Sequence, residues 1–115
     1  MSEIAVTNNT IQWAINKGTT SSIAINKSDG WAMYDQIRME FKELKEVNYP
    51  AFLTLTVGGG LTISGNRLII SITYAQSLLF ASGLIHADIK LKIGTEVIAP
   101  IPFLITITDT VTKLP

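Results

Sequence analysis

Apolar and polar residues alternate along most of this chain, which is the pattern of β-strands with one buried face. The first alternating segment covers residues 10–15 and includes Trp13, which we expect in the core because aromatic residues on alternating strands usually pack there. A second segment, residues 23–25, follows a turn at Gly18. Another turn is expected at residues 28–30, where an aspartate precedes a glycine. The chain therefore begins as two strands joined by a turn, with a further turn after them.

Residues 34–47 fit two different structures. Alternate residues from Ile37 to Phe41 are apolar, as in a strand, whereas Phe41 and Leu44 extend a helical stripe. The Glu, Lys, Leu and Met content of the segment favours a helix. We predict a strand that ends near Lys42.

A β-hairpin is expected in the middle of the chain. Residues 52–57 are alternating and β-branched, which predicts a strand that ends at the three glycines 58–60. Residues 61–64 and 68–72 flank a Gly-Asn turn at 65–66, which predicts two paired strands.

One short helical segment is expected near residues 74–81. Thr73 and Gln76 have the spacing of a capping box, in which each side chain bonds the backbone of the other residue. Gly83 stands where a C-terminal helix cap would lie.

The cleanest alternation follows from Leu84. The expected apolar face carries Ile85, Ala87, Ile89, Leu91 and Ile93. The expected polar face carries His86, Asp88, Lys90 and Lys92. In the last apolar segments, residues 97–108, Pro100 and Pro102 lack a backbone donor, so we expect them at a sheet edge or a bulge. About seven or eight short strands with turns between them predict an all-β sandwich.

The composition predicts one soluble domain, residues 1–115, with a flexible N-terminus at 1–9 and a flexible tail at 109–115. Hydrophobic residues make up 47% of the chain, which is enough for a core without disulfides, since cysteine is absent. Nine basic residues balance nine acidic ones, so nucleic acid and membranes are not expected partners. A neutral, apolar chain favours contacts with its own copies or other proteins. We see no secretory signal and no apolar run long enough to span a membrane.

The chain offers few residues for chemistry. His86 and Asp88 share the polar face of one strand and could form an acid–base pair, but the pattern supplies no nucleophile, and solvated strand residues are the alternative. A metal site would need more ligands than one histidine and scattered acids, and we expect no cofactor. The glycines at 58–60 lack the Lys-Ser/Thr of a phosphate loop. The remaining acids alternate with lysines, as on a solvated face: Glu40, Glu43 and Glu46 with Lys42 and Lys45. We expect no catalytic residue.

Two aromatic residues are candidates for contact with a partner or a ligand. Trp31 directly follows the turn at 28–30, and Tyr49 precedes a proline. An exposed Trp31 would serve as an interface anchor, since tryptophan is common at the centres of binding sites. The core is the alternative location for both side chains.

Several short motifs occur in an order that resembles a known family. They are Ile15-Asn16-Lys17-Gly18, Gln36-Ile37-Arg38, Gly65-Asn66-Arg67-Leu68-Ile69-Ile70-Ser71-Ile72, Ala75-Gln76-Ser77, Gly83, Ala87-Asp88-Ile89 and the closing segment 105–112. Together they resemble the immunoglobulin-like domains of phage and prophage tail and baseplate proteins, similar to the N-terminal domain of upper baseplate proteins. The lead-in at residues 29–33 is shorter than in that family, and the paired prolines have no counterpart in it.

The resemblance implies an immunoglobulin-like β-sandwich in a structural protein of a virion, in a tail, baseplate or fibre attachment, made in the bacterial cytoplasm. Its expected partners are other particle proteins and copies of itself, and no active site is implied. Because the chain ends soon after the domain, we expect a free-standing module. The alternative function is a carbohydrate- or peptide-binding β-sandwich in which Trp31 and Tyr49 contact the ligand.

Overall fold

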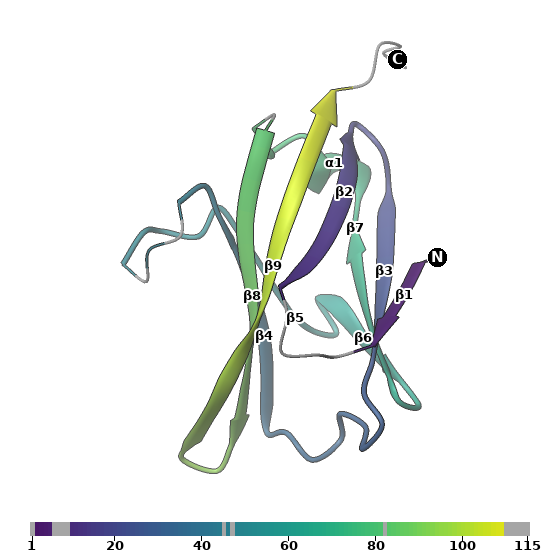
Figure 1. The fold of residues 1–115 in the computed structure, drawn as a ribbon, viewed down its shortest axis with the longest axis vertical. Helices are drawn as coiled ribbons and strands as arrows, with labels where there is room; N and C mark the ends of the chain where they lie inside the picture. The colour runs from purple at the N-terminus through teal and green to yellow at the C-terminus, as the bar shows by residue number, and fades with distance from the viewer. Residues whose placement is uncertain (1, 6–9, 45, 47, 82, 110–115) are drawn as a thin grey trace.

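The computed structural model describes residues 2–5, 10–44, 46, 48–81 and 83–109, which form nine strands and one short helix (Figure 1). The elements are β1 (Ser2–Ala5), β2 (Ile11–Lys17), β3 (Ser21–Asn26), β4 (Gln36–Lys42), β5 (Leu53–Val57), β6 (Gly60–Ser64), β7 (Arg67–Ile72), α1 (Tyr74–Ser77), β8 (Gly83–Ile93) and β9 (Glu96–Asp109). The strand count exceeds the prediction because residues 2–5, expected to be flexible, pair with β3 as β1. Asp109, the first residue of the expected flexible tail, is the last residue of β9, where it pairs with Lys17 of β2. The rest of the expected flexible segments, 1, 6–9 and 110–115, lies outside the described residues.

The strands form one hydrogen-bonded sheet that folds over on itself. Its order is β1-β3-β7-β6-β5-β4-β8-β9-β2. The layer β1-β3-β7-β6 faces the layer β5-β4-β8-β9-β2 (Figure 1). The layers meet where β5 and β6 pair in parallel over only two residue pairs, Thr56 with Gly60 and Val57 with Leu61. The prediction of an all-β sandwich with one short helical turn is confirmed.

The core lies between the two layers and contains the predicted apolar faces. The largest fully buried side chains are Trp31, Phe41, Phe80, Ile15, Ile23, Ile25, Met39, Leu55, Leu61, Leu68, Ile70 and Ile72. At the α1 end, the ring of Phe80 stacks on Phe41 with centroids 5.7 Å apart and meets the ring of Phe52 edge-on at 5.3 Å. Such aromatic pairs stabilise a core by about 0.5–1.5 kcal/mol beyond burial of their area.

Local sequence signals set several of these elements correctly. The segment with two possible structures forms strand β4, and it ends at Lys42 as predicted. The expected hairpin is β6–β7, in which Ser64 pairs with Arg67 across a two-residue turn. The capping box is present: the Thr73 side chain accepts from the Gln76 backbone N–H at 3.1 Å, and the Gln76 side chain accepts from Thr73 N–H at 2.9 Å.

Two expectations need correction. Gly83 does not cap the helix, which ends at Ser77 with Leu78 as its C-cap; Gly83 begins β8 with a φ of 112°. Ile93 is 40% exposed because β8 runs on past the core into its hairpin with β9. The predicted turn at Gly18 is confirmed, and the two strands that it joins lie in different layers: β2 pairs with β9, and β3 pairs with β1 and β7. The turn at Gly18 thus carries the chain from one layer to the other.

The two prolines lie where a missing backbone donor is tolerated. The pairing of β8 with β9 shifts register between Ile89 and Leu91, and Pro100 belongs to the β9 segment that bulges there. Pro102 pairs with Asp88 on β8, but the pairing with β2 starts only at Phe103. The prediction of an edge or a bulge is confirmed.

Candidate binding face

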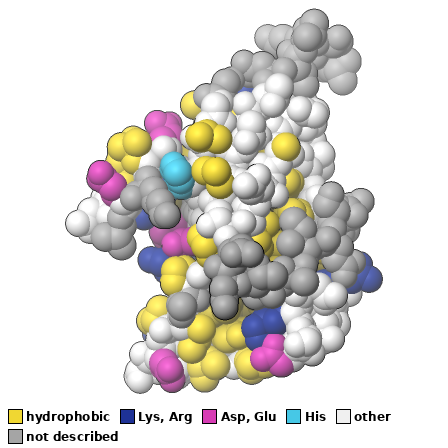
Figure 2. Space-filling view, in the orientation of Figure 1, with side chains coloured by type: hydrophobic (Ala, Val, Ile, Leu, Met, Phe, Trp, Pro, Cys, Tyr) yellow, Lys and Arg dark blue, Asp and Glu magenta, His cyan; other side chains and the backbone are white. Residues whose placement is uncertain are grey.

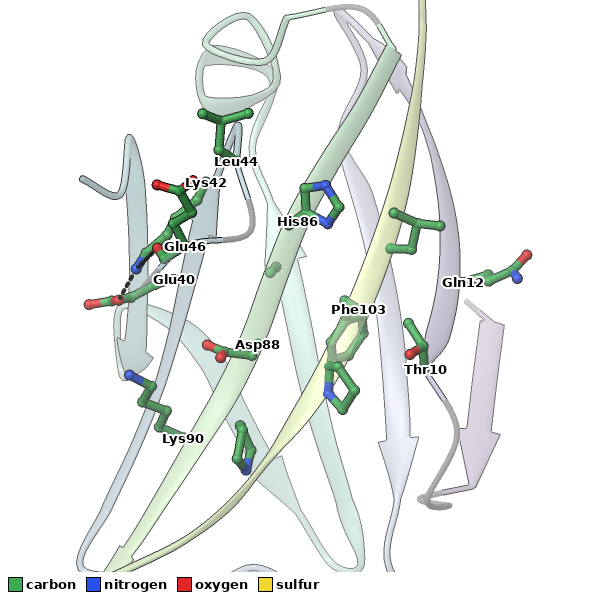
Figure 3. Close-up of a pocket in the computed structure, with 14 residues that line it drawn as sticks. Thr10, Gln12, Glu40, Lys42, Leu44, Glu46, His86, Asp88, Lys90 and Phe103 are labelled. Atoms are coloured by element: carbon green, nitrogen blue, oxygen red, sulfur yellow. Dashed lines mark hydrogen bonds and ion pairs between the residues drawn. The ribbon is translucent and has the colours of Figure 1, made fainter. Parts of the chain in front are cut away.

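The outer face of the β4-β8-β9-β2 layer contains a trough with a volume of about 520 Å³ (Figure 3). Residues of four strands and of the segment after β4 line it, and Figure 3 shows His86 and Asp88 along its middle on β8. The volume is within the range of small-ligand sites.

The strand register arranges the side chains of the trough in rows across the sheet. Along a row from β4 to β2, the side chains change from charged to apolar and then to amide. One row runs from Lys42 on β4 through His86 and Leu104 to Gln12 on β2. These side chains point outward because their neighbours in the sequence, such as Phe41 and Ala87, are buried in the core. The face therefore offers ion pairing along β4 and β8 and apolar contact along β9.

The second row places two carboxylates opposite each other, Glu40 on β4 and Asp88 on β8. Glu40 is compensated on its own strand: Arg38 Nε lies 3.1 Å from Glu40 Oε2, and Lys42 Nζ lies 3.8 Å from Glu40 Oε1. Burial raises the pKa of Asp88 and Glu40 adds to the rise, while Lys90 and Lys42 oppose it. Burial is therefore the main reason that the charged form of Asp88 is disfavoured, and the repulsion from Glu40 directly opposite is the smaller contribution.

The candidate acid–base pair does lie together on this face, since His86 and Asp88 both line the trough. The trough is also lined by the hydroxyl-bearing Thr10 and by lysines. Within the described residues, no hydrogen bond joins the imidazole of His86 to any of these side chains. No group of three or more His, Cys, Asp or Glu residues that could hold a metal occurs in the described part of the chain.

The acidic and basic run after β4 contributes to the trough only in part. Glu40, Lys42 and Glu46 line it, whereas Glu43 is exposed outside it. The ammonium group of Lys42 donates to the backbone oxygen of Glu46 at 3.3 Å, which holds the segment after β4 beside the trough. Lys45 lies outside the described residues.

The candidate contact residue Trp31 is fully buried, with 0% of its surface exposed. Its indole N–H donates to the backbone oxygen of Asn66 at 3.0 Å, which links the connection between β3 and β4 to the β6–β7 turn. The sequence left Trp31 open between the surface and the core, and the structure places it in the core, so Trp31 is not available as a contact residue. Trp13 is 8% exposed, which confirms its predicted place in the core.

Tyr49 is half-buried, and its backbone N–H donates to the Glu46 oxygen at 3.1 Å. It does not line the trough. A contact through Tyr49 stays a prediction. Among the described residues that line the trough, the one Phe, Trp or Tyr is Phe103, which is 2% exposed.

The three glycines after β5 serve the corner between the layers. Gly58 N–H donates to Leu61 O at 2.9 Å, and Gly59 N–H donates to Thr56 O at 2.8 Å. Gly60 has a φ of 106°, which favours glycine. Since two of these amides are used within the turn, the segment is not a phosphate-binding loop.

Sequence reasoning identified His86 and Asp88 as polar strand residues but did not find the trough. Glu40, Gln12 and Leu104 come from three different strands, and only long-range pairing brings them beside β8. The signal in the sequence that could have indicated this face is that the outward positions of several strands carry charged or amide side chains.

No protein-family model matches the chain, and no curated protein matches it. Two similar solved structures are strand-swapped dimers of mouse leukocyte-associated immunoglobulin-like receptor 1. Its Ig-like domain aligns with a TM-score of 0.44 and 14% identity over 85% of this chain and 90% of that chain. Its extracellular domain gives 0.43 and 13% over 85% and 89%. No helix in the described residues is long and apolar enough to cross a membrane.

Proposed function

We propose that this chain is a non-enzymatic structural protein of a phage or prophage particle, which acts in a tail, baseplate or fibre attachment through protein–protein contacts. The ordered sequence motifs support the particle setting. The observation that carries the contact role is the distribution of exposed apolar side chains, which gather at both ends of the long axis of the molecule.

At one end, α1 and the residues after it expose Tyr74, Leu78 and Leu79, with the Leu side chains 47% and 58% exposed. At the other end, the β8–β9 hairpin exposes Ile93 and Val97, the latter to 65%. Figure 2 shows hydrophobic side chains gathered at that second end. Large apolar groups at both ends favour stacking between neighbouring subunits, since contiguous exposed apolar surface is typical of protein interfaces.

The particle setting is tested on virions purified from the organism that encodes the chain, after prophage induction or phage infection. We expect mass spectrometry to find the chain at a fixed ratio to the tail proteins, and immunogold labelling to place it at the tail. Intact tails that lack the chain would contradict the proposal. A variant in which Leu79 and Val97 are both replaced by Ser is expected to fold but to be missing from the particles.

The trough supports a second candidate function, a peptide-binding domain. A carbohydrate site is less well supported, because sugar-binding faces use exposed aromatic rings, whereas Phe103, the one Phe, Trp or Tyr among the described lining residues, is buried. Nuclear magnetic resonance titration with an arrayed set of extended peptides tests this candidate. We expect a binder to shift the amide signals of His86 and Gln12, and Leu104→Glu to abolish the shifts. Shifts confined to residues outside the trough would rule this function out.

A further inference from the structure

Strand β2 is an edge of the sheet without a proline, a bulge or a charged side chain before its last residue, although α1 lies near the end of β2 at Lys17. It pairs in parallel with β9 from Ile11 to Lys17, and no other described strand pairs with its second edge. The strand that precedes it in the sequence, β1, pairs with β3 in the other layer. The seven residues of β2 keep a regular register, without a bulge.

Edge strands usually avoid pairing with other chains by means of charged side chains, proline or bulges. Strand β2 contains no proline, and its first charged residue is the terminal Lys17. Its outward side chains are exposed and are small or amide-bearing: Gln12, Ala14 and Asn16. The chain has zero formal net charge, so two copies do not repel each other as whole molecules.

We propose that β2 pairs with β2 of a second copy of this chain, antiparallel about a two-fold axis, with Ala14 opposite Ala14. This proposal deepens the proposed function by naming a partner and a surface. It rests on the part of the proposed function in which copies of this chain contact one another. Because residues directly opposite in antiparallel strands share a face, the register must keep the buried faces of the two copies together.

This register is self-complementary along the whole strand. Trp13 lies opposite Ile15 on the buried face, which is a favourable aromatic and β-branched pair. Gln12 lies opposite Asn16 on the outer face, where two amides can exchange hydrogen bonds. Lys17 lies opposite Ile11, so no like charges face each other. Centring the pair on Ala14 also uses all seven residues of β2.

The two-fold axis runs perpendicular to the sheet and keeps the outer faces of both copies on the same side. Gln12 lines the trough and also belongs to β2, so the two troughs lie on one continuous surface on either side of the axis. A dimer of this kind presents two equivalent binding faces to one partner.

Disulfide trapping tests the register directly, because the natural chain has no cysteine. Opposed Cα atoms in antiparallel strands lie about 4.5–5.5 Å apart, within the range that a disulfide bridges. We expect Ala14→Cys to form a covalent dimer under mild oxidation about a hundredfold faster than Thr62→Cys, an exposed strand position on the other layer. Equal rates for the two variants would overturn the proposal.

A mixture of Gln12→Cys and Asn16→Cys checks the same register without touching Ala14. We expect cross-links between the two variants but none within either, since identical positions lie about 13 Å apart along the strands. Cross-linking of Gln12→Cys to itself at the rate of the mixture would overturn the register. As a reversible test, Ala14→Lys sets two lysines opposite each other and is expected to raise the dimer dissociation constant about fivefold or more. Thr62→Lys, the matched control, is expected to leave it unchanged.

The two proposals fail separately. Absence of the chain from particles, with Ala14→Cys still trapped as a dimer, removes the particle role and leaves the β2 contact. Presence in particles, with Ala14→Cys and Thr62→Cys oxidising alike, removes the β2 contact and leaves the particle role.

Discussion

Replacement of Gly60 by alanine tests how the sheet turns from one layer to the other. Gly60 begins β6 at the corner where β5 and β6 pair, and its φ is 106°. A Cβ built on Gly60 would lie 2.6 Å from Leu55 Cδ2 and 3.2 Å from Leu55 Cγ. Leu55 is fully buried, so its side chain cannot move aside without disturbing the core.

The expected cost has two parts. Alanine at a positive φ costs about 1–3 kcal/mol wherever it occurs. Overpacking against a buried side chain adds about 1–3 kcal/mol. Gly58→Ala is the matched control, because Gly58 also has a positive φ, 87°, but a Cβ there meets no atom within 4 Å. The free energy of unfolding of Gly60→Ala is therefore expected to lie about 1–3 kcal/mol below that of Gly58→Ala.

Urea unfolding followed by tryptophan fluorescence measures both values, since Trp13 and Trp31 are buried in the native state. The wild-type and both variants should show a single transition with the same slope. Equal losses of stability in Gly60→Ala and Gly58→Ala would refute the reasoning, because they would mean that Leu55 yields without cost and that the corner is not tightly packed.

Three further predictions concern other parts of the fold. Trp31→Phe removes the indole donor to Asn66 O and leaves a small cavity, while the Lys27 N–H still bonds that oxygen; thermal unfolding should show a loss of about 1–3 kcal/mol. Thr73→Ala breaks the capping box and should cost about 0.5–2 kcal/mol, whereas Thr62→Ala on an exposed strand should cost less. Burial raises the folded-state pKa of Asp88 above its usual value of 3.8. Between these two pKa values the native state binds more protons than the unfolded state, so the free energy of unfolding falls as the pH rises from the lower value to the higher one. Asp88→Asn should abolish this fall, which leaves the variant more stable than wild type at neutral pH and equal to it below pH 3.8; an unchanged pH profile in the variant would count against a raised pKa.

The strand pattern of this chain was readable from the sequence because most strands have one face in the core. The alternation from Ile85 to Leu91 is preserved in the burial of β8, and the strand from Ile37 to Phe41 outweighed the helical composition of its segment. Tertiary burial decided that segment, since alternate residues of β4 reach the core and a helix there would not place them so. Ile93 departs from the pattern only because β8 extends beyond the second layer.

The pairing of strands and the binding face were not readable in the same way. Strand β2 lies beside β9, some ninety residues later, and no local signal specifies such a neighbour. The opposition of Glu40 to Asp88 depends on the register between β4 and β8, which the sequence of either strand leaves open. The sequence left the location of Trp31 open, because the acceptor of its indole N–H is a backbone oxygen at a turn that is distant in the sequence.

The most direct test of the account is the mass of the purified wild-type chain in solution, measured by sedimentation equilibrium over a series of micromolar concentrations. The account predicts a reversible equilibrium between monomer and dimer that shifts toward monomer in Ala14→Lys and not in Thr62→Lys. A wild-type chain that stays monomeric across the whole series would contradict the claim that this domain acts by assembling with copies of itself.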